Sequence, residues 1–298
     1  MFGDISYPLR PVVIDQETCF FLPADYVANN QDPVASLHEF MTLDIFSHNN
    51  GQYLPQSESF LEIVAFAKTY LQQDEDKLKK LFFHNVCHTF HPVKGVLSVA
   101  LKLAIIDGIS PTDQCYERIG LAAALHDIGN IIQRQEHEQI SIDVSYKKLV
   151  ELGYSQSVID SVACSIYSTA IDYKDNIAKR QVGSREAKIL SDADLSNPGF
   201  YDVNNFATES IKIWLELDLF AMSEFETTGV EFTRQFFTSL GGYYTRAAAF
   251  LFSDKRRTNL RLLGPEIKTL MKKADYSQEK LVELVLSTDQ RIASLTTG

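Results

Sequence analysis

Cysteine is scarce in this chain, with four in 298 residues. Cys19, Cys87, Cys115 and Cys164 are widely spaced, and no C-x-x-C pair occurs among them. This spacing indicates neither a disulfide framework nor a zinc site built from thiolates. We therefore expect reduced thiols and a cytoplasmic location.

Basic residues are also in short supply, since 28 Lys and Arg stand against 39 Asp and Glu and give a net charge of −11. Such a charge repels the backbone of nucleic acids and anionic membrane surfaces. The apolar runs, such as residues 247–252, are too short to span a bilayer, and residues 1–13 lack the regions of a signal peptide. We expect neither a nucleic-acid partner nor a membrane partner.

Histidine, by contrast, is concentrated in one stretch. Five of the seven histidines lie within residues 84–137. Residues 84–88 read HNVCH, residues 126–130 read HDIGN, and residues 193–198, further along, read ADLSNP. Imidazole and carboxylate groups without thiolates are typical of an open transition-metal site that keeps reactive water.

Helical spacing supports a single site. Steps of four and seven residues place His84, His88 and His91 on one face of a helix. The neighbours His126 and Asp127 diverge by about 100° around a helix axis, yet both can reach one ion beside the helix. We therefore interpret the blocks as parts of one metal site.

The three blocks resemble motifs of the HD superfamily of metal-dependent phosphohydrolases, and most closely of its cyclic nucleotide phosphodiesterase branch. Residues 84–88 (HNxxH) are similar to the first histidine block of that family, residues 125–129 (LHDIG) to its His-Asp doublet, and residues 193–198 to the segment with its last aspartate. The blocks also occur in the family's order, which makes them far more specific than a lone His-Asp pair. The resemblance covers residues 81–198.

The resemblance implies a ligand set and a catalytic pair. The metal ligands would be His88, His126, Asp127 and Asp194, holding one or two divalent ions (Mn, Fe, Zn, Mg or Ni). Asp127 would also serve catalysis by bridging two ions that activate the attacking water. His84 resembles the family's general acid, which protonates the leaving oxygen.

Further residues are candidates for secondary roles. His137 follows the doublet, where family members place a histidine near a second metal or the substrate phosphate, and Thr169 resembles a family threonine near the metals. Gln235 lies in the region where the family reads its base with a glutamine. Asp192 is an alternative ligand two residues before Asp194, but the motif places the ligand at Asp194.

These features lead us to expect an enzyme that cleaves a phosphate ester by metal-activated water. The expected partner is a small phosphorylated substrate, a phosphodiester of a nucleotide-like molecule. Two alternatives stay open: a nucleotide phosphomonoesterase, and a non-catalytic HD module that binds a nucleotide. Metal analysis and a panel of phosphate esters would separate the three.

The expected fold is all-α, an HD-domain helical bundle, because no stretch shows sustained period-two alternation. One predicted helix carries His84 and His88 and continues or restarts past Pro92. Another leads into His126, and a helix over residues 185–190 delivers Asp194.

The chain divides into three expected parts. Residues 1–57 have prolines and Asn-rich turns and would form an N-terminal cap of loops and short helices. Residues 58–264 would form the HD-type catalytic domain. Residues 265–298 would form C-terminal helices, beginning with a helix at Pro265, that pack on the core or on a second subunit in a homodimer.

Overall fold

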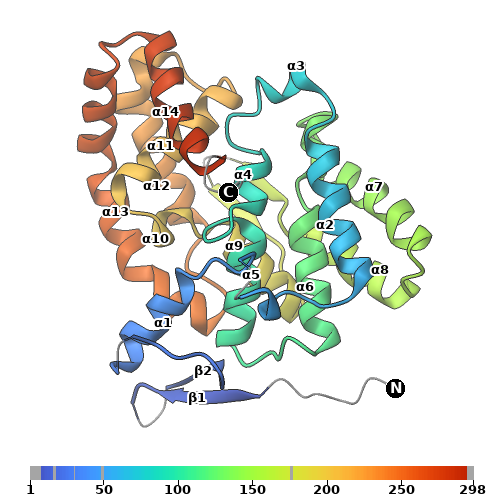
Figure 1. Cartoon of the computed structure of the whole chain (residues 1–298). Coiled ribbons are helices and arrows are strands. Elements are labelled where there is room, and N and C mark those ends of the chain that lie inside the picture. Colours follow the sequence, from blue (N-terminus) through green and yellow to red (C-terminus); the bar gives the residue numbers. More distant parts are fainter. Residues whose placement is uncertain (1–7, 16–17, 30, 48–49, 175–176, 294–298) are drawn as a thin grey trace.

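The computed structural model describes residues 8–15, 18–29, 31–47, 50–174 and 177–293, without the side chains of 288–293. The start of the expected N-terminal cap and the last five residues of the expected C-terminal part lie outside these ranges. Within them, the chain is mostly helical, and its strands form two antiparallel hairpins (Figure 1). The prediction of a mostly helical fold is confirmed.

The α-helices are α1 (Pro33–Met41), α2 (Glu58–Leu71), α3 (Glu75–Leu78), α4 (Val86–Phe90), α5 (Val96–Ile106), α6 (Gln114–Leu125), α7 (His137–Glu151), α8 (Gln156–Tyr167), α9 (Arg185–Asp194), α10 (Asn197–Phe200), α11 (Val203–Glu216), α12 (Val230–Ser239), α13 (Arg246–Lys273) and α14 (Gln278–Ala293). Short 3₁₀ segments are η1 (Gly51–Tyr53), η2 (Ile128–Ile131) and η3 (Met222–Glu224), and η4 (Phe225–Gly229) is a π-helical turn. The strands are β1 (Leu9–Val13), β2 (Cys19–Pro23), β3 (Ile171–Lys174) and β4 (Ile177–Arg180).

Capping side chains fix where several helices begin. Ser57, Asp113, Ser184 and Thr245 each accept a backbone N–H from the first turn of α2, α6, α9 and α13. Such caps satisfy N–H groups that a helix leaves without a partner. The helix predicted from residue 185 is confirmed as α9, which runs on to Asp194.

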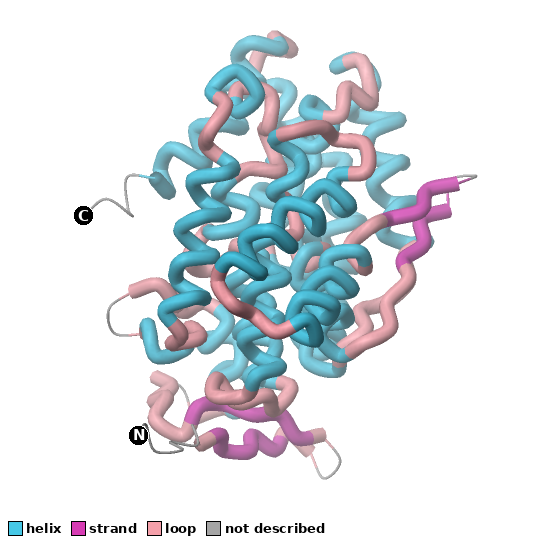
Figure 2. The backbone as a smooth tube through the Cα atoms, turned by 90° about the vertical axis from the view of Figure 1, so that its right-hand side faces the viewer, coloured by secondary structure: helices cyan, strands magenta, loops and turns pink. Residues whose placement is uncertain are grey.

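The two hairpins are elements that the sequence analysis did not predict. β1 pairs with β2 inside the expected N-terminal cap, and β3 pairs with β4 between α8 and α9. Figure 2 shows both hairpins at the edge of the helical body. Each strand has only four or five residues, and β1 and β4 bury one residue each, Val12 and Ala178. Alternation over so few positions is too short to recognise as a period of two.

The first hydrophobic cluster surrounds α5, whose eleven residues are all buried. A helix that is enclosed on every side packs against neighbours all round, here including β2, α1, α6 and α9. Its one charged residue, Lys102, donates from Nζ to the carbonyl oxygens of Met41, Leu43 and Val93 at 2.7, 2.8 and 2.8 Å. The N-terminal segment is therefore anchored on the helix that supports the site.

A second hydrophobic cluster joins α11, η4, α13 and α14. Trp214 of α11 is fully buried, packs edge-on against Phe225, and donates from Nε1 to Thr233 Oγ1 at 3.1 Å. From α14, Leu281 and Val285 are fully buried in this cluster. Among the described residues, the C-terminal helices thus pack on the chain's own core.

The expectation that a new helix begins at Pro265 is wrong, because α13 continues through it. Proline lacks the N–H that would bind the carbonyl four residues earlier, Arg261. The guanidinium of Arg234 supplies donors instead, to Leu260 O at 2.9 Å and Arg261 O at 3.1 Å. A side chain from another helix therefore provides the donor that the proline lacks. The expected domain boundary at residue 264 falls inside α13.

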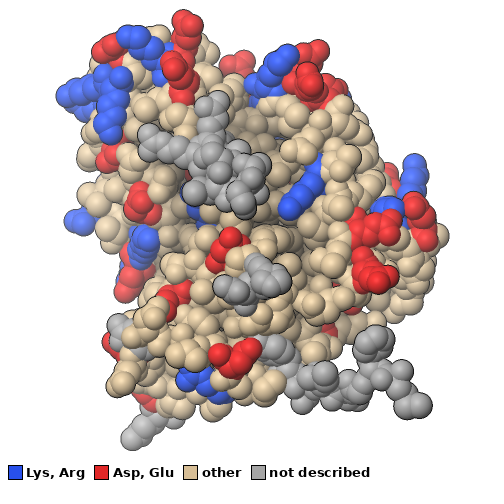
Figure 3. Space-filling model, in the orientation of Figure 1, with Lys and Arg blue, Asp and Glu red and all other residues tan. Residues whose placement is uncertain are grey.

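The elements form two groups around a central layer. In Figure 1, α11 to α14 lie to one side, α2, α6, α7 and α8 lie to the other, and α4, α5 and α9 lie between them. On the face shown in Figure 3, acidic and basic side chains are intermixed, and the basic ones occur in small separate groups. None of the helices in the described part of the chain has the length and apolar character that a membrane span requires.

Candidate metal centre

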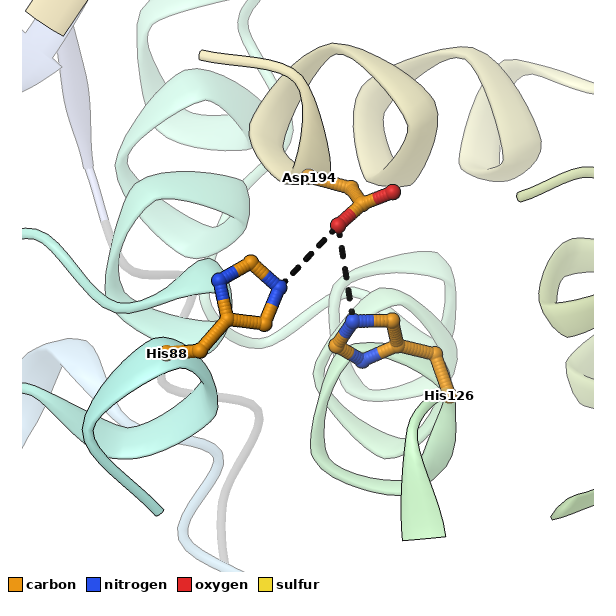
Figure 4. Close-up of side chains that lie close together, drawn as sticks. All are labelled: His88, His126 and Asp194. Carbon is orange, nitrogen blue, oxygen red and sulfur yellow. Dashed lines mark hydrogen bonds and ion pairs between the residues drawn. The ribbon is translucent and has the colours of Figure 1, made fainter. Parts of the chain in front are cut away.

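Three predicted ligands converge in the central layer. His88 comes from α4, His126 from the end of α6, and Asp194 from the last turn of α9 (Figure 4). Asp194 Oδ1 lies 3.2 Å from His88 Nε2 and 3.6 Å from His126 Nε2. One ligand atom from each residue lies within 4.8 Å of the others. Atoms that bind one ion at about 2.0–2.2 Å have comparable mutual distances, so this group could hold a metal ion.

Local hydrogen bonds set the direction of both imidazoles. The Asn85 side chain accepts the N–H groups of Cys87 and His88 at 2.8 and 3.3 Å and so begins α4 just before His88. His126 donates from Nδ1 to Ala123 O at 2.9 Å. This bond fixes the tautomer of a neutral His126 and leaves its Nε2 lone pair facing the centre.

Asp127 lies directly beside this group. Its Oδ2 is 3.4 Å from His88 Nε2 and 3.2 Å from His126 Nε2, and its Oδ1 accepts from Asn130 Nδ2 at 3.0 Å. Two buried atoms, His126 Nε2 and Asp127 Oδ2, make no hydrogen bond. Buried polar atoms without a hydrogen bond are costly and rare, and a cation between them would remove that cost.

The structure also brings His137 and Thr169 to the site. His137 begins α7, donates from Nδ1 to Arg134 O at 3.0 Å, and presents Nε2 3.6 Å from Asp127 Oδ1. Asp127 therefore has imidazoles on both sides of its carboxylate. The Thr169 hydroxyl donates to Ile166 O at 2.7 Å and lies on the wall of the same cavity.

The electrostatics of the centre favour charged carboxylates. Burial lowers the pKa of His126, but the neighbouring Asp127 and Asp194 outweigh burial and raise it well above its ordinary value. Burial raises the pKa of Asp127 and Asp194, but the imidazoles outweigh it and lower both pKa values. For His137, burial is the larger effect and lowers its pKa. The centre is thus arranged to attract positive charge.

His84 lies elsewhere than expected. The prediction that it shares a helix with His88 is wrong, because Asn85 caps α4 and leaves His84 in the preceding loop. Its side chain is nevertheless buried beside the centre, and its ring centroid is 5.7 Å from that of His88. A loop residue needs a partner to hold its ring in place, and Glu216 of α11 provides it.

Glu216 binds the loop of His84 in three places. One carboxylate oxygen accepts the N–H groups of Phe83 and His84 at 2.7 and 3.0 Å, and the other binds His84 Nδ1. Burial raises the pKa of Glu216, but the charge and hydrogen bond of His84 outweigh it and lower that pKa. Sequence analysis missed Glu216, because its partner lies 132 positions away and an acidic residue at a helix end is usually exposed to solvent.

Three other candidates lie outside the centre. Asp192 is fully buried, and its carboxylate accepts two backbone N–H groups and the Thr245 hydroxyl. Gln235 is exposed, donates to Glu231 on its own helix, and does not line the cavity. His91 ends α4, where its Nδ1 accepts two backbone N–H groups and burial lowers its pKa to about 4. Each of the three has a local structural role.

A cavity of about 410 Å³ opens beside the candidate ligands. His84, Asp127, His137 and Asp194 line one part of it, together with Arg134. Most of the remaining wall is apolar and comes from the region of α11, α12 and β3, with Ile171, Tyr173, Phe206, Ile213, Trp214, Leu217, Leu219, Phe232, Phe236 and Phe237. The cavity therefore joins a polar, charged part to an apolar one.

No protein-family model, curated protein or solved structure matches this chain. Function is therefore inferred from the site itself.

The donor set of the centre limits its chemistry. Imidazole nitrogens and carboxylate oxygens suit Zn, Fe, Mn and similar divalent ions, and no thiolate lies among the candidate ligands. A buried centre that opens onto a cavity leaves room for water and a substrate beside an ion. The arrangement is suited to metal-assisted hydrolysis more than to a purely structural cross-link.

Proposed function

We propose that the protein is a metal-dependent phosphohydrolase of the HD superfamily. The observation that carries this proposal is the buried convergence of His88, His126 and Asp194, with an unbonded Asp127 oxygen facing both imidazoles. These are the residues of the three sequence motifs, brought together from α4, the end of α6 and α9. Their order in the chain and their meeting in space support the same function.

His88, His126, Asp127 and Asp194 would hold the metal. A divalent ion held there would lower the pKa of a water molecule and neutralise the phosphoryl oxygens. The two sides of the Asp127 carboxylate support a role for His137 as well, because Oδ2 faces His88 and His126 while Oδ1 faces His137. A second ion or a phosphate oxygen would therefore lie on the His137 side.

The proton for the leaving group would come from His84. Glu216 binds its Nδ1, which leaves Nε2 to face the cavity that His84 lines. As water attacks phosphorus, the bond from phosphorus to the leaving oxygen breaks, and that oxygen takes the proton from Nε2. Arg134, on the same wall, adds a fixed positive charge for the phosphate, held by its bond to Asn130 Oδ1 at 2.8 Å.

Metal analysis combined with an ester panel tests the proposal. The purified protein, loaded with manganese, should bind about one to two equivalents of metal and hydrolyse phosphate esters. His126→Ala and Asp194→Ala should lose both metal and activity, whereas the exposed Gln235→Ala serves as a control that keeps both. Wild-type protein that binds no metal, or that binds metal and cleaves no phosphate ester, would contradict the proposal.

A leaving-group comparison isolates the role of His84. His84→Ala should keep its metal and lose a factor of about 100 to 10,000 in rate on esters of alkyl alcohols, which need a proton. A nitrophenolate leaves without one, so the variant should be far less impaired on a nitrophenyl ester. Equal losses on both esters at full metal content would rule out proton donation.

A further inference from the structure

The apolar part of the cavity wall has a composition that bears on the substrate. Tyr173 of β3 and Phe232 and Phe236 of α12 form what we call the aromatic wall. The Tyr173 ring centroid lies 5.4 Å from that of Phe232 and 6.2 Å from that of Phe236, and Phe232 stacks on Phe236 at 6.1 Å. Three rings in mutual contact present a broad, apolar surface to the cavity.

Three polar side chains that α11 and α12 contribute to the lining are bonded within the protein. Thr233 accepts the indole N–H of Trp214 at 3.1 Å, and the Ser210 hydroxyl donates to Phe206 O at 2.9 Å. Glu209, the one acid that α11 contributes to the lining, lies 3.0 Å from Lys212 Nζ. A heterocyclic base placed here would leave much of its hydrogen-bonding edge without partners, which is costly in a buried site.

The two parts of the cavity together suit one kind of molecule. The charged groups in the lining include His84, Asp127, His137, Asp194, Arg134, Glu136 and Glu138, and the apolar residues line the same 410 Å³ space. Small-molecule sites commonly have volumes of about 300–1,000 Å³, so there is room for a substrate body beyond the phosphate. We infer that the substrate is a phosphate ester of an apolar alkyl or aryl alcohol, whose hydrocarbon part lies against the aromatic wall.

This inference rests on the proposed phosphohydrolase function and refines its substrate. Each methylene removed from water contributes enough to raise kcat/KM by about threefold to fourfold, until the cavity is full. The base of a nucleotide with equal charge would stack on the aromatic wall, but it would lose its hydrogen bonds to water on entering the cavity. The expected order is therefore long-chain alkyl and naphthyl esters first, and nucleotides and short-chain esters last.

The test uses the full-length, manganese-loaded protein and matched esters. We would measure kcat/KM for ethyl, butyl, hexyl and octyl phosphate, for 1-naphthyl phosphate and for 5′-AMP, with the methyl diesters of the same alcohols and 3′,5′-cyclic AMP as the diester arm. The expected result is a rise of about threefold per methylene and at least a tenfold advantage of octyl or naphthyl esters over the nucleotides. A flat chain-length series, or a nucleotide as the best substrate, would overturn the inference.

Variants of the aromatic wall and of Asn197 separate the two substrate classes. Phe232→Ala and the milder Phe232→Leu should reduce the octyl-to-ethyl ratio of kcat/KM, by about tenfold for Ala, while Gln235→Ala on the exposed face of α12 keeps the wild-type ratio. Asn197 is the neutral amide that lines the cavity; a selective loss on nucleotides in Asn197→Ala would support base recognition and overturn the inference. Hydrolysis without dependence on chain length refutes only the apolar substrate, whereas no hydrolysis of any ester refutes the phosphohydrolase function.

Discussion

Replacing Glu216 by Gln removes one charge from the partner of His84 and keeps its shape. In the wild type, all hydrogen-bond donors around this carboxylate are N–H groups: those of Phe83 and His84 on one oxygen, and His84 Nδ1–H on the other. An amide has one oxygen and one NH₂ group. In Glu216→Gln, the NH₂ group must therefore face either the imidazole N–H or the two backbone N–H groups.

The cost of this mismatch follows from burial. The Glu216 side chain is 4% exposed, so an unpaired donor there has no access to bulk water. Leaving a buried donor without an acceptor costs about 1–3 kcal/mol, and we expect this loss in the free energy of unfolding. Glu216→Ala, which removes every acceptor, should lose about 3–5 kcal/mol.

The stability loss should depend on pH in a defined direction. The folded state lowers the pKa of Glu216 from its ordinary value of 4.5, so the unfolded chain binds the proton more readily. The carboxylate's contribution is thus fully present above about pH 4.5 and is lost as the pH falls through the lower folded value. Urea unfolding of metal-free wild type and Glu216→Gln should give a difference in free energy that shrinks as the pH falls below about 4.5.

Activity provides the second assay for Glu216→Gln. Glu216 holds the His84 ring through Nδ1, so the variant should protonate an alkyl leaving group less well while keeping its metal. We expect a loss of about 10- to 100-fold in kcat, the usual effect of removing a carboxylate that orients an imidazole, and a smaller loss on a nitrophenyl ester. Glu231→Gln, on the exposed face of α12, is the matched control. Wild-type kcat on alkyl esters in Glu216→Gln would refute the pairing as part of the mechanism.

Three further predictions concern metal binding and packing. Apparent manganese affinity, measured by titration, should rise with pH, because the metal must displace the proton of His126. Nearby carboxylates outweigh burial and raise the pKa of this imidazole. An affinity that does not depend on pH would contradict this prediction. Gly129→Ala places a Cβ 2.1 Å from His137 O and should cost about 3 kcal/mol in urea unfolding, whereas Gly183→Ala, with nothing within 4 Å, should cost little. Lys102→Met removes the Nζ donor from the carbonyls of Met41, Leu43 and Val93, of which Val93 O keeps the Ser98 hydroxyl at 3.2 Å. It should lower the free energy of unfolding by about 3 kcal/mol, and an unchanged urea midpoint would refute the role of Nζ.

Local sequence signals predicted the helices that carry the ligands. Spacing and caps indicated α6, which ends at His126, and α9, which ends at Asp194, and these helices do bring the two residues together. The motif order suggested that His88 would join them. A helix period and a terminal ligand are properties of neighbouring residues, so they can be read without knowledge of the fold.

Features that depend on distant residues could not be predicted in this way. The His84–Glu216 contact joins positions 132 residues apart. Helix α13 continues past Pro265, where Arg234 of α12 donates to Leu260 O and to Arg261 O, the carbonyl that the proline leaves without its helical donor. A proline usually ends or kinks a helix, and a glutamate at a helix end is usually exposed. Here contacts with residues distant in the sequence override both tendencies. The hairpins could not be predicted for another reason, because their strands are too short to show a clear alternation of apolar and polar residues.

The site divides between the two hydrophobic clusters, and this division would make the proposed metal binding and the proposed proton donation separable. His88, His126 and Asp194 extend from helices of the first cluster, whereas Glu216 ends α11, two residues after the buried Trp214 of the second. The aromatic wall also contacts the second cluster, because Phe232 of α12 packs edge-on against Phe220, which packs edge-on against Trp214. A change that loosens α11 would therefore move the partner of the proton donor and the substrate wall together while the ligands keep their places. Lost activity at full metal content is the signature that such a change would leave.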